Sequence, residues 1–144
     1  MSDETTMPDS SDEEFNAMRG RQSVIGFVSD AVTYVEPDAT LRHVAEVLRS
    51  ADVSLVVVSN GTMLYGVVSE RDIVDAVALG IDLDSTPVTT IEAEDLKWAT
   101  SISTVDDVAE EMLENYLRHV LVGSDDGGLV GVVSMRDLLT AYLV

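Results

Sequence analysis

A seven-residue phrase occurs twice in this chain. Residues 66–72 read GVVSERD and residues 131–137 read GVVSMRD, so the two copies differ only at their fifth position. Their first residues, Gly66 and Gly131, lie 65 positions apart in a chain of 144 residues. A duplication of this kind is typical of a supersecondary unit repeated in tandem. The chain should therefore fold as two related halves.

The net charge limits the classes of partner. The sequence has 27 Asp and Glu residues against 8 Lys and Arg residues, which gives a formal charge of −19. Such a surface repels phosphate backbones, so we expect no nucleic-acid binding through a basic face. Cationic partners or metal ions are an alternative, but no clustered ligand set supports them. Because the acidic excess is spread along the chain, adaptation to a cytoplasm of high salt is the favoured interpretation.

Other classes are excluded by what the sequence lacks. It contains no cysteine, which removes disulfides, thiolate metal sites and a cysteine nucleophile. Its apolar runs are strand-sized, so neither a secretory signal nor a membrane span is expected, and the protein should be cytoplasmic. Residues 1–22 are polar and acidic, which predicts a disordered tail. The acidic run at residues 10–14 is alternatively an interaction peptide.

Each half is predicted to follow the order strand, helix, strand, strand, helix. Apolar residues at helical spacing predict helices after Thr40 and after Thr104, and a turn at Asn60-Gly61 joins two apolar strands. The helices match at an offset of 64 residues and the hairpins at 65, which predicts one inserted residue between helix and strand. We expect an α+β fold in which the halves occupy residues 24–80 and 98–144, joined by a linker over residues 81–97 that holds a short helix near residues 88–93.

These patterns resemble a tandem pair of CBS domains, a Bateman module, over residues 24–144. Both phrases match the family's Gly-x-x-[Ser/Thr]-x-x-Asp signature. The resemblance implies two β-α-β-β-α repeats packed as a pseudo-two-fold pair. It also implies clefts between the repeats that hold AMP, ADP, ATP or S-adenosylmethionine. The ligand-binding residues carried over by position, or suggested by charge, are Gly66, Ser69, Arg71, Asp72, Arg118, His119, Gly131, Ser134, Arg136 and Asp137.

Several of these residues have a structural alternative. Ser-x-x-Asp before an apolar helix is also a capping box that needs no ligand. The resemblance favours ribose binding by Asp72 and Asp137, and one group can serve both roles. Arg71 and Arg136 are candidates for phosphate contacts or for pairing with acids in the first helical turn. Trp98 either stacks on a base or covers the core.

The two halves differ just before their second strands. Arg118-His119 precedes the strand of the second half, whereas we aligned Val53-Ser54 with this position in the first. A phosphate-bearing ligand should therefore prefer the cleft that Arg118 and His119 face. The alternative is that these residues only balance nearby acids. His43, the other histidine, is expected to be structural.

No catalytic or metal-binding motif is present, so we expect a protein that is not an enzyme and requires no cofactor. The leading hypothesis is a regulatory module that senses an adenosine-containing metabolite and signals to an effector protein in trans. A homodimer is expected because the last helix of each half is too apolar for free solvent. The alternative is a structural CBS dimer whose clefts hold no ligand.

Overall fold

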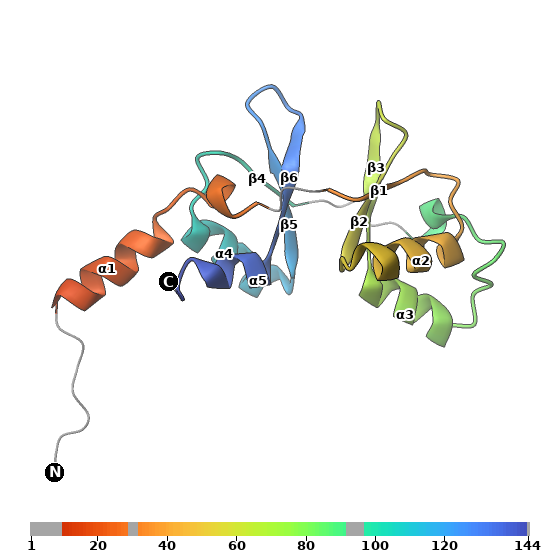
Figure 1. The fold of residues 1–144 in the computed structure, drawn as a ribbon, viewed down its shortest axis with the longest axis horizontal. Helices are drawn as coiled ribbons and strands as arrows, with labels where there is room; N and C mark the ends of the chain where they lie inside the picture. The colour runs from red at the N-terminus through yellow and green to blue at the C-terminus, as the bar shows by residue number, and fades with distance from the viewer. Residues whose placement is uncertain (1–9, 29–31, 92–96, 144) are drawn as a thin grey trace, which may run out of the picture. The chain divides into compact units, whose positions relative to one another are not determined.

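A computed structural model describes residues 10–28, 32–91 and 97–143. The chain divides into two compact units, which we describe separately. Unit 1 contains residues 1–30 and 98–144, and unit 2 contains residues 31–97. Each unit has a three-stranded sheet with two helices on one face (Figure 1). Among the described residues, no helix has the length and apolar character that crossing a membrane requires.

Unit 2 has the predicted order of elements. Its elements are β1 (Tyr34–Val35), α2 (Leu41–Ala51), β2 (Leu55–Ser59), β3 (Leu64–Ser69) and α3 (Glu70–Ala78). Strand β2 lies in the middle of the sheet, parallel to β1 and antiparallel to β3. The buried core joins apolar residues of the sheet to Leu41, Val44 and Leu48 of α2 and Ile73 of α3. The spacing of these residues along each helix is what places one apolar face against the sheet.

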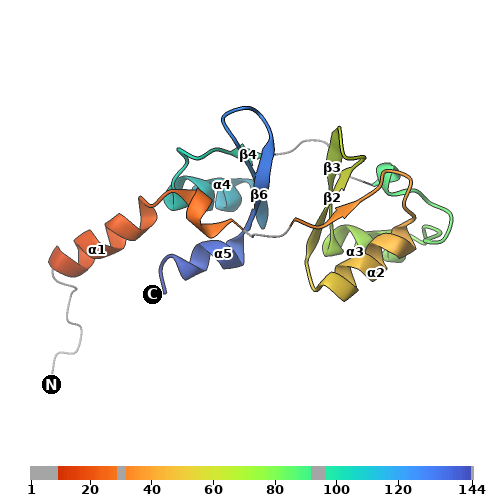
Figure 2. The ribbon, with the colours of Figure 1, turned by 45° about the horizontal axis from the view of Figure 1, so that its top comes forward.

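Unit 1 repeats this arrangement. Its elements are β4 (Trp98–Ala99), α4 (Val105–Asn115), β5 (His119–Gly123), β6 (Leu129–Ser134) and α5 (Met135–Thr140). The two helices again lie on a single face of the sheet, as both views show (Figures 1 and 2). The α+β prediction and the β-α-β-β-α order of each half are confirmed.

The domain boundaries differ from the predicted ones because short segments are exchanged between the repeats. Val24, in the 3₁₀ turn η1 (Val24–Phe27), is completely buried in the core of unit 1, which otherwise comes from the second repeat. Its equivalent at an offset of 64, Val88 in η2 (Val88–Thr90), is completely buried in the core of unit 2. Residues 81–91 of the predicted linker thus belong to the folded part of unit 2 and include η2, near the predicted short helix, while residues 92–96 lie outside the described part of the chain.

Backbone hydrogen bonds hold both exchanged segments in place. The Val24 amide donates to the Ser103 carbonyl oxygen at 2.9 Å, and the Val88 amide donates to the Ala39 carbonyl oxygen at 2.7 Å. Ser103 lies just before Thr104, the N-cap residue of α4, and Ala39 lies just before Thr40, the N-cap residue of α2. Each exchanged segment therefore closes the same end of its host unit.

Two other expectations change. Residues 10–20 of the predicted disordered tail form helix α1 (Ser10–Gly20), while residues 1–9 lie outside the described part of the chain. The inserted residue lies in the β-hairpin turn, which has four residues in unit 2 (60–63) and five in unit 1 (124–128). An exposed hairpin turn absorbs an extra residue without shifting the strands that it joins, whereas the tight connection between helix and strand does not.

Candidate functional site

The Ser and Asp of each repeated phrase form a capping box. In unit 1, the Ser134 amide donates to Asp137 Oδ2 at 2.8 Å and the Asp137 amide donates to Ser134 Oγ at 3.0 Å. In unit 2, the Ser69 amide donates to Asp72 Oδ2 at 2.8 Å and the Asp72 amide donates to Ser69 Oγ at 3.3 Å. The capping prediction is confirmed for both phrases.

Capping leaves part of each carboxylate available. A carboxylate offers about four lone-pair sites on its two oxygens. Within the described residues, the hydrogen bonds to Asp72 and Asp137 side chains all go to Oδ2. Oδ1 of each residue is therefore open to a further donor such as a ribose hydroxyl. The structural role and the binding role predicted for these residues are compatible.

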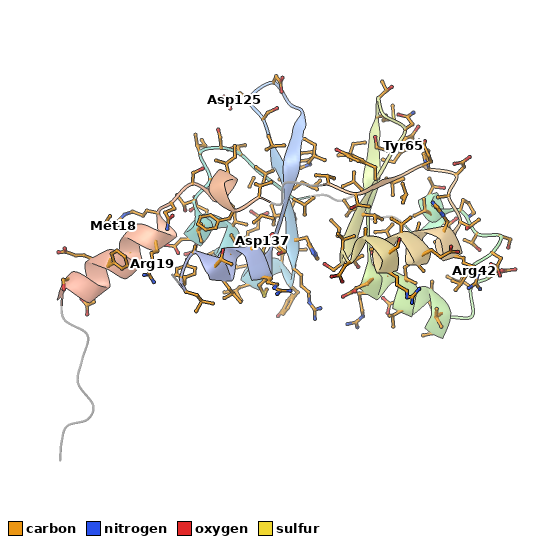
Figure 3. All side chains as sticks on the ribbon, viewed as in Figure 1. Met18, Arg19, Arg42, Tyr65, Asp125 and Asp137 are labelled. Atoms are coloured by element: carbon orange, nitrogen blue, oxygen red, sulfur yellow. The ribbon has the colours of Figure 1, made fainter. Side chains whose placement is uncertain are left out.

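The register of the hairpin places Arg118 and His119 beside the second phrase. His119 on β5 lies directly opposite Ser134 on β6. The Arg118 carbonyl oxygen accepts a hydrogen bond from the Met135 amide at 2.8 Å, which joins the start of β5 to the start of α5. We call the place where β5, β6 and α5 meet the unit 1 corner, and Figure 3 labels Asp137 there. Residues predicted from separate parts of the sequence thus meet at one place.

The unit 2 corner has the same backbone and different side chains. Leu55 lies opposite Ser69, and the Ser54 carbonyl oxygen accepts a hydrogen bond from the Glu70 amide at 2.9 Å. Arg118 and His119 therefore correspond to Ser54 and Leu55. The alignment with Val53-Ser54 was wrong by one position because it placed the inserted residue before the strand.

The two arginines within the phrases also differ in their surroundings. Arg71 Nε lies 3.5 Å from Asp75 Oδ1, in an exposed pair one helical turn apart. Arg71 therefore pairs with an acid, as one alternative predicted, although the acid lies beyond the first turn. In unit 1 the residue at the matching position is Thr140, whose hydroxyl donates to the Asp137 carbonyl oxygen at 2.5 Å. Arg136 forms no salt bridge with another residue in the described part of the chain.

These differences give the corners opposite charges. The unit 1 corner has Arg118 and Arg136 against Asp137, a formal net charge of +1 with His119 neutral. The matching positions of unit 2 hold one cation and three acids, a formal net charge of −2, from Glu70, Arg71, Asp72 and Asp75. The sequence analysis recognised Arg118 and His119, but it missed the contributions of Glu70 and Asp75. Aligning the helices that follow the phrases would have revealed them.

The other candidates lie outside the corners. Gly66 and Gly131 are buried in β3 and β6 opposite Val58 and Val122, where each pair of strands has a register shift. Trp98 is 41% exposed on edge strand β4. A Cβ added at Gly123 would come within 3.3 Å of its ring, so the indole covers the backbone of the neighbouring strand.

Two further residue sets bear on the expected chemistry. His43 is exposed on α2 and contributes nothing to the core. Over residues 10–28, 32–91 and 97–143, no group of three or more His, Asp or Glu side chains is placed to hold a metal ion. The corners therefore offer hydrogen-bonding and charged groups as their binding chemistry.

The chain is similar to known proteins over most of its length. Residues 24–79 and 81–144 each match the CBS domain family. The uncharacterised 17.7 kDa protein in the bps2 3′ region of Acidianus ambivalens is 37% identical over 113 residues, which covers 78% of this chain and 68% of that protein.

Two solved structures are also similar to this chain in their fold. A CBS domain protein from Pyrobaculum aerophilum, complexed with AMP, is 32% identical with a TM-score of 0.73, over 84% of this chain and 98% of that one. The CBS domain of a bacterial CNNM/CorC family Mg²⁺ transporter, in complex with ATP, shares the fold at 18% identity with a TM-score of 0.77, over 91% of this chain and 94% of that one. The chain belongs to the CBS domain family and carries two CBS domains in tandem.

Proposed function

We propose that this protein is a regulatory module that binds one adenine nucleotide at the unit 1 corner and signals its level to an effector protein. CBS domain proteins are generally regulatory or binding modules rather than enzymes. The 32% identical relative from Pyrobaculum aerophilum is complexed with AMP, which supports the ligand class. We choose the unit 1 corner because the two corners have the same backbone structure but differ in charge.

The groups at the unit 1 corner match the parts of a nucleotide monophosphate. Asp137 Oδ1 is available to accept hydrogen bonds from ribose hydroxyls, and charge-assisted bonds of this kind are about twice as strong as neutral ones. Arg118 and Arg136 are both exposed and supply positive charge for the phosphate. In a chain of formal charge −19, a local excess of cations also directs a phosphate to this place.

Isothermal titration with AMP, in a buffer of high salt, tests the proposal. We expect one binding event per chain. Asp137→Ala should abolish it, and Asp72→Ala is the matched control, because it removes the same capping box from the other repeat. Loss of binding in both variants would show that the effect comes from weakened folding. Binding of AMP that is unaffected by Asp137→Ala would contradict the proposed site.

Titration with S-adenosylmethionine distinguishes recognition of the ribose from recognition of the phosphate. This compound carries adenosine but no phosphate, so any contact that the arginines of the unit 1 corner make with it goes to its amino-acid carboxylate and not to a phosphate. If the protein binds this compound in preference to AMP, ribose recognition stands and phosphate recognition falls. If none of AMP, ATP and S-adenosylmethionine binds or raises the melting temperature, the alternative of a structural CBS homodimer without ligand replaces the sensing function.

A further inference from the structure

Helix α1 is attached to unit 1 near the end of α5. Arg19 Nη1 donates a hydrogen bond to the Tyr142 carbonyl oxygen at 2.8 Å, between residues 123 positions apart in the sequence. Figure 3 shows Arg19 on the side of α1 that faces the end of α5. The Arg19 guanidinium also lies 4.3 Å from the centre of the Phe15 ring, which holds it in place from within α1.

A second contact locks the same junction. The Tyr142 hydroxyl donates a hydrogen bond to Asp106 Oδ1 in the first turn of α4. Burial and the Asp106 carboxylate raise the pKa of Tyr142 to about 12, because both disfavour the charged phenolate. Gly20, the last residue of α1, lies so close that an added Cβ would overlap this carboxylate. We call Arg19, Gly20, Asp106 and Tyr142 the latch.

Helix α5 connects the latch to the unit 1 corner. It has only six residues, so its length is about 9 Å. Ser134 and Asp137 cap its start, and Tyr142 follows two residues after its last residue, Thr140. Isolated helices of this length are not stable in water, because nucleation costs more than a few hydrogen bonds return. The order of α5 therefore depends on the burial of Leu138 in the core of unit 1 and on what holds the two ends of the helix.

We infer that nucleotide binding at the unit 1 corner is coupled to the docking of α1 through α5, so that α1 is the element that reports ligand binding. This inference rests on the proposed function. A ligand on Asp137 stabilises the start of α5, and the latch stabilises its end. Both favour the same ordered helix, so each strengthens the other. By thermodynamic linkage, docked α1 must raise nucleotide affinity by the factor by which nucleotide favours docking.

Within residues 32–91 and 97, the described part of unit 2, no equivalent of the latch is found. The position that matches Tyr142 is Val77, whose side chain is 58% exposed on α3. The chain continues from α3 into residues 81–91, which pack on unit 2 itself through bonds such as that from the Arg42 amide to the Leu83 carbonyl oxygen. The latch thus lies in the same unit as the positively charged corner, as coupling between the corner and α1 requires.

Hydrogen exchange of α1 and AMP titration, on three forms of the 144-residue chain, test the coupling. Gly20→Ala pushes the Asp106 carboxylate off Tyr142, and because alanine favours helix, it does so without weakening α1 itself. Gly26→Ala is the matched control, since a Cβ there meets nothing within 4 Å. AMP should slow exchange in α1 of the wild type and of Gly26→Ala but not of Gly20→Ala. The AMP affinity of Gly20→Ala should fall about fivefold.

The outcomes separate the two proposals. If AMP binds the wild type but leaves exchange in α1 unchanged, the coupling is overturned and the proposed function stands. The same holds if Gly20→Ala binds AMP as tightly as Gly26→Ala does. If AMP binds none of the three proteins, the proposed function and the coupling both fall.

Discussion

The corners of the two units share the same backbone hydrogen bonds and capping boxes, yet one has a formal net charge of +1 and the other −2. The phrase that forms both corners is nearly identical, and its serine and aspartate have the same partners in each unit. The difference in charge comes from positions in or near the phrase whose side chains the fold does not require. The main ones are Arg118, which corresponds to Ser54 in unit 2, and Met135, which corresponds to Glu70. Duplication has kept the scaffold and changed the electrostatics.

This comparison separates residues that preserve the fold from residues that select a ligand. Ser69, Asp72, Ser134 and Asp137 satisfy backbone amides at the start of a helix, and this role alone is enough to keep them in both repeats. Positions 54 and 118 contribute a backbone carbonyl in both units, which any residue supplies. Their side chains are therefore able to differ, and charge at these positions is a guide to binding.

The largest expected effect tests the shared scaffold. Val24→Asp places a carboxylate in the core of unit 1 and should lower the free energy of unfolding by about 4 kcal/mol or more. Val88→Asp should do the same to unit 2. Hydrogen exchange should show the loss of protection in α4 for the first variant and in α2 for the second.

The neighbouring position supplies the control for this scaffold test. Ile25 is 42% exposed, so Ile25→Asp introduces the same charge with an expected cost of about 0.5 kcal/mol. If Val24→Asp instead removed protection from α2, the exchange of segments between the repeats would be contradicted, and residues 24–27 would belong with the first repeat as the sequence suggested.

The second effect tests the difference in charge. Arg118→Ser gives the unit 1 corner the residue found in unit 2 and should weaken AMP binding about 10- to 100-fold, since a hydrogen bond to a charged group contributes about 1.5–3 kcal/mol. Arg49→Ser is the control, because it removes the same charge from an exposed position on α2. Titration that shows equal weakening in both variants would indicate a general effect of net charge and not a contact at the corner.

The order of elements was predictable from the sequence because it depends on local patterns. Apolar spacing, the Asn60-Gly61 turn and the capping boxes that begin at Ser69, Thr104 and Ser134 each act within a few residues. The exchange of Val24 and Val88 was not predictable in this way, because a buried valine in a short apolar segment carries no sign of which repeat it will join. Helix α1 was missed for a related reason, since an acidic segment of low hydropathy gains its order from contacts such as Arg19 with Tyr142.

The candidate site was predictable in part. The phrase and the basic residues before β5 were recognised, and the hairpin register brought them together. What failed was the alignment of the corners, because a single inserted residue was placed in the wrong turn. Pairing across strands fixes register by side-chain alternation over the whole hairpin. The register of the hairpin therefore depends on how its two strands pair, and it cannot be derived from the sequence of either strand alone.

A smaller effect tests whether the two capping boxes are equal. Ser69→Ala and Ser134→Ala should each lower the free energy of unfolding by about 1 kcal/mol in the absence of nucleotide. Chemical denaturation measures both. With AMP at saturation, the Ser134→Ala variant should regain less stability than Ser69→Ala, because its corner binds the ligand. No loss of stability in either variant without AMP would contradict the capping role.

The smallest effect concerns Arg71 and Arg136, which occupy the same position in the two phrases. Arg71→Ala breaks a pair with Asp75 in which the two side chains are 77% and 59% exposed, so the loss of stability should be at most about 0.5 kcal/mol, with AMP affinity unchanged. Arg136→Ala should leave stability unchanged, because no acid faces it one turn along the helix, and should weaken AMP binding. Denaturation and titration of both variants measure these two quantities side by side. If Arg71→Ala weakened AMP binding as much as Arg136→Ala, the unit 2 corner would also hold nucleotide, and charge would not be what distinguishes the two repeats.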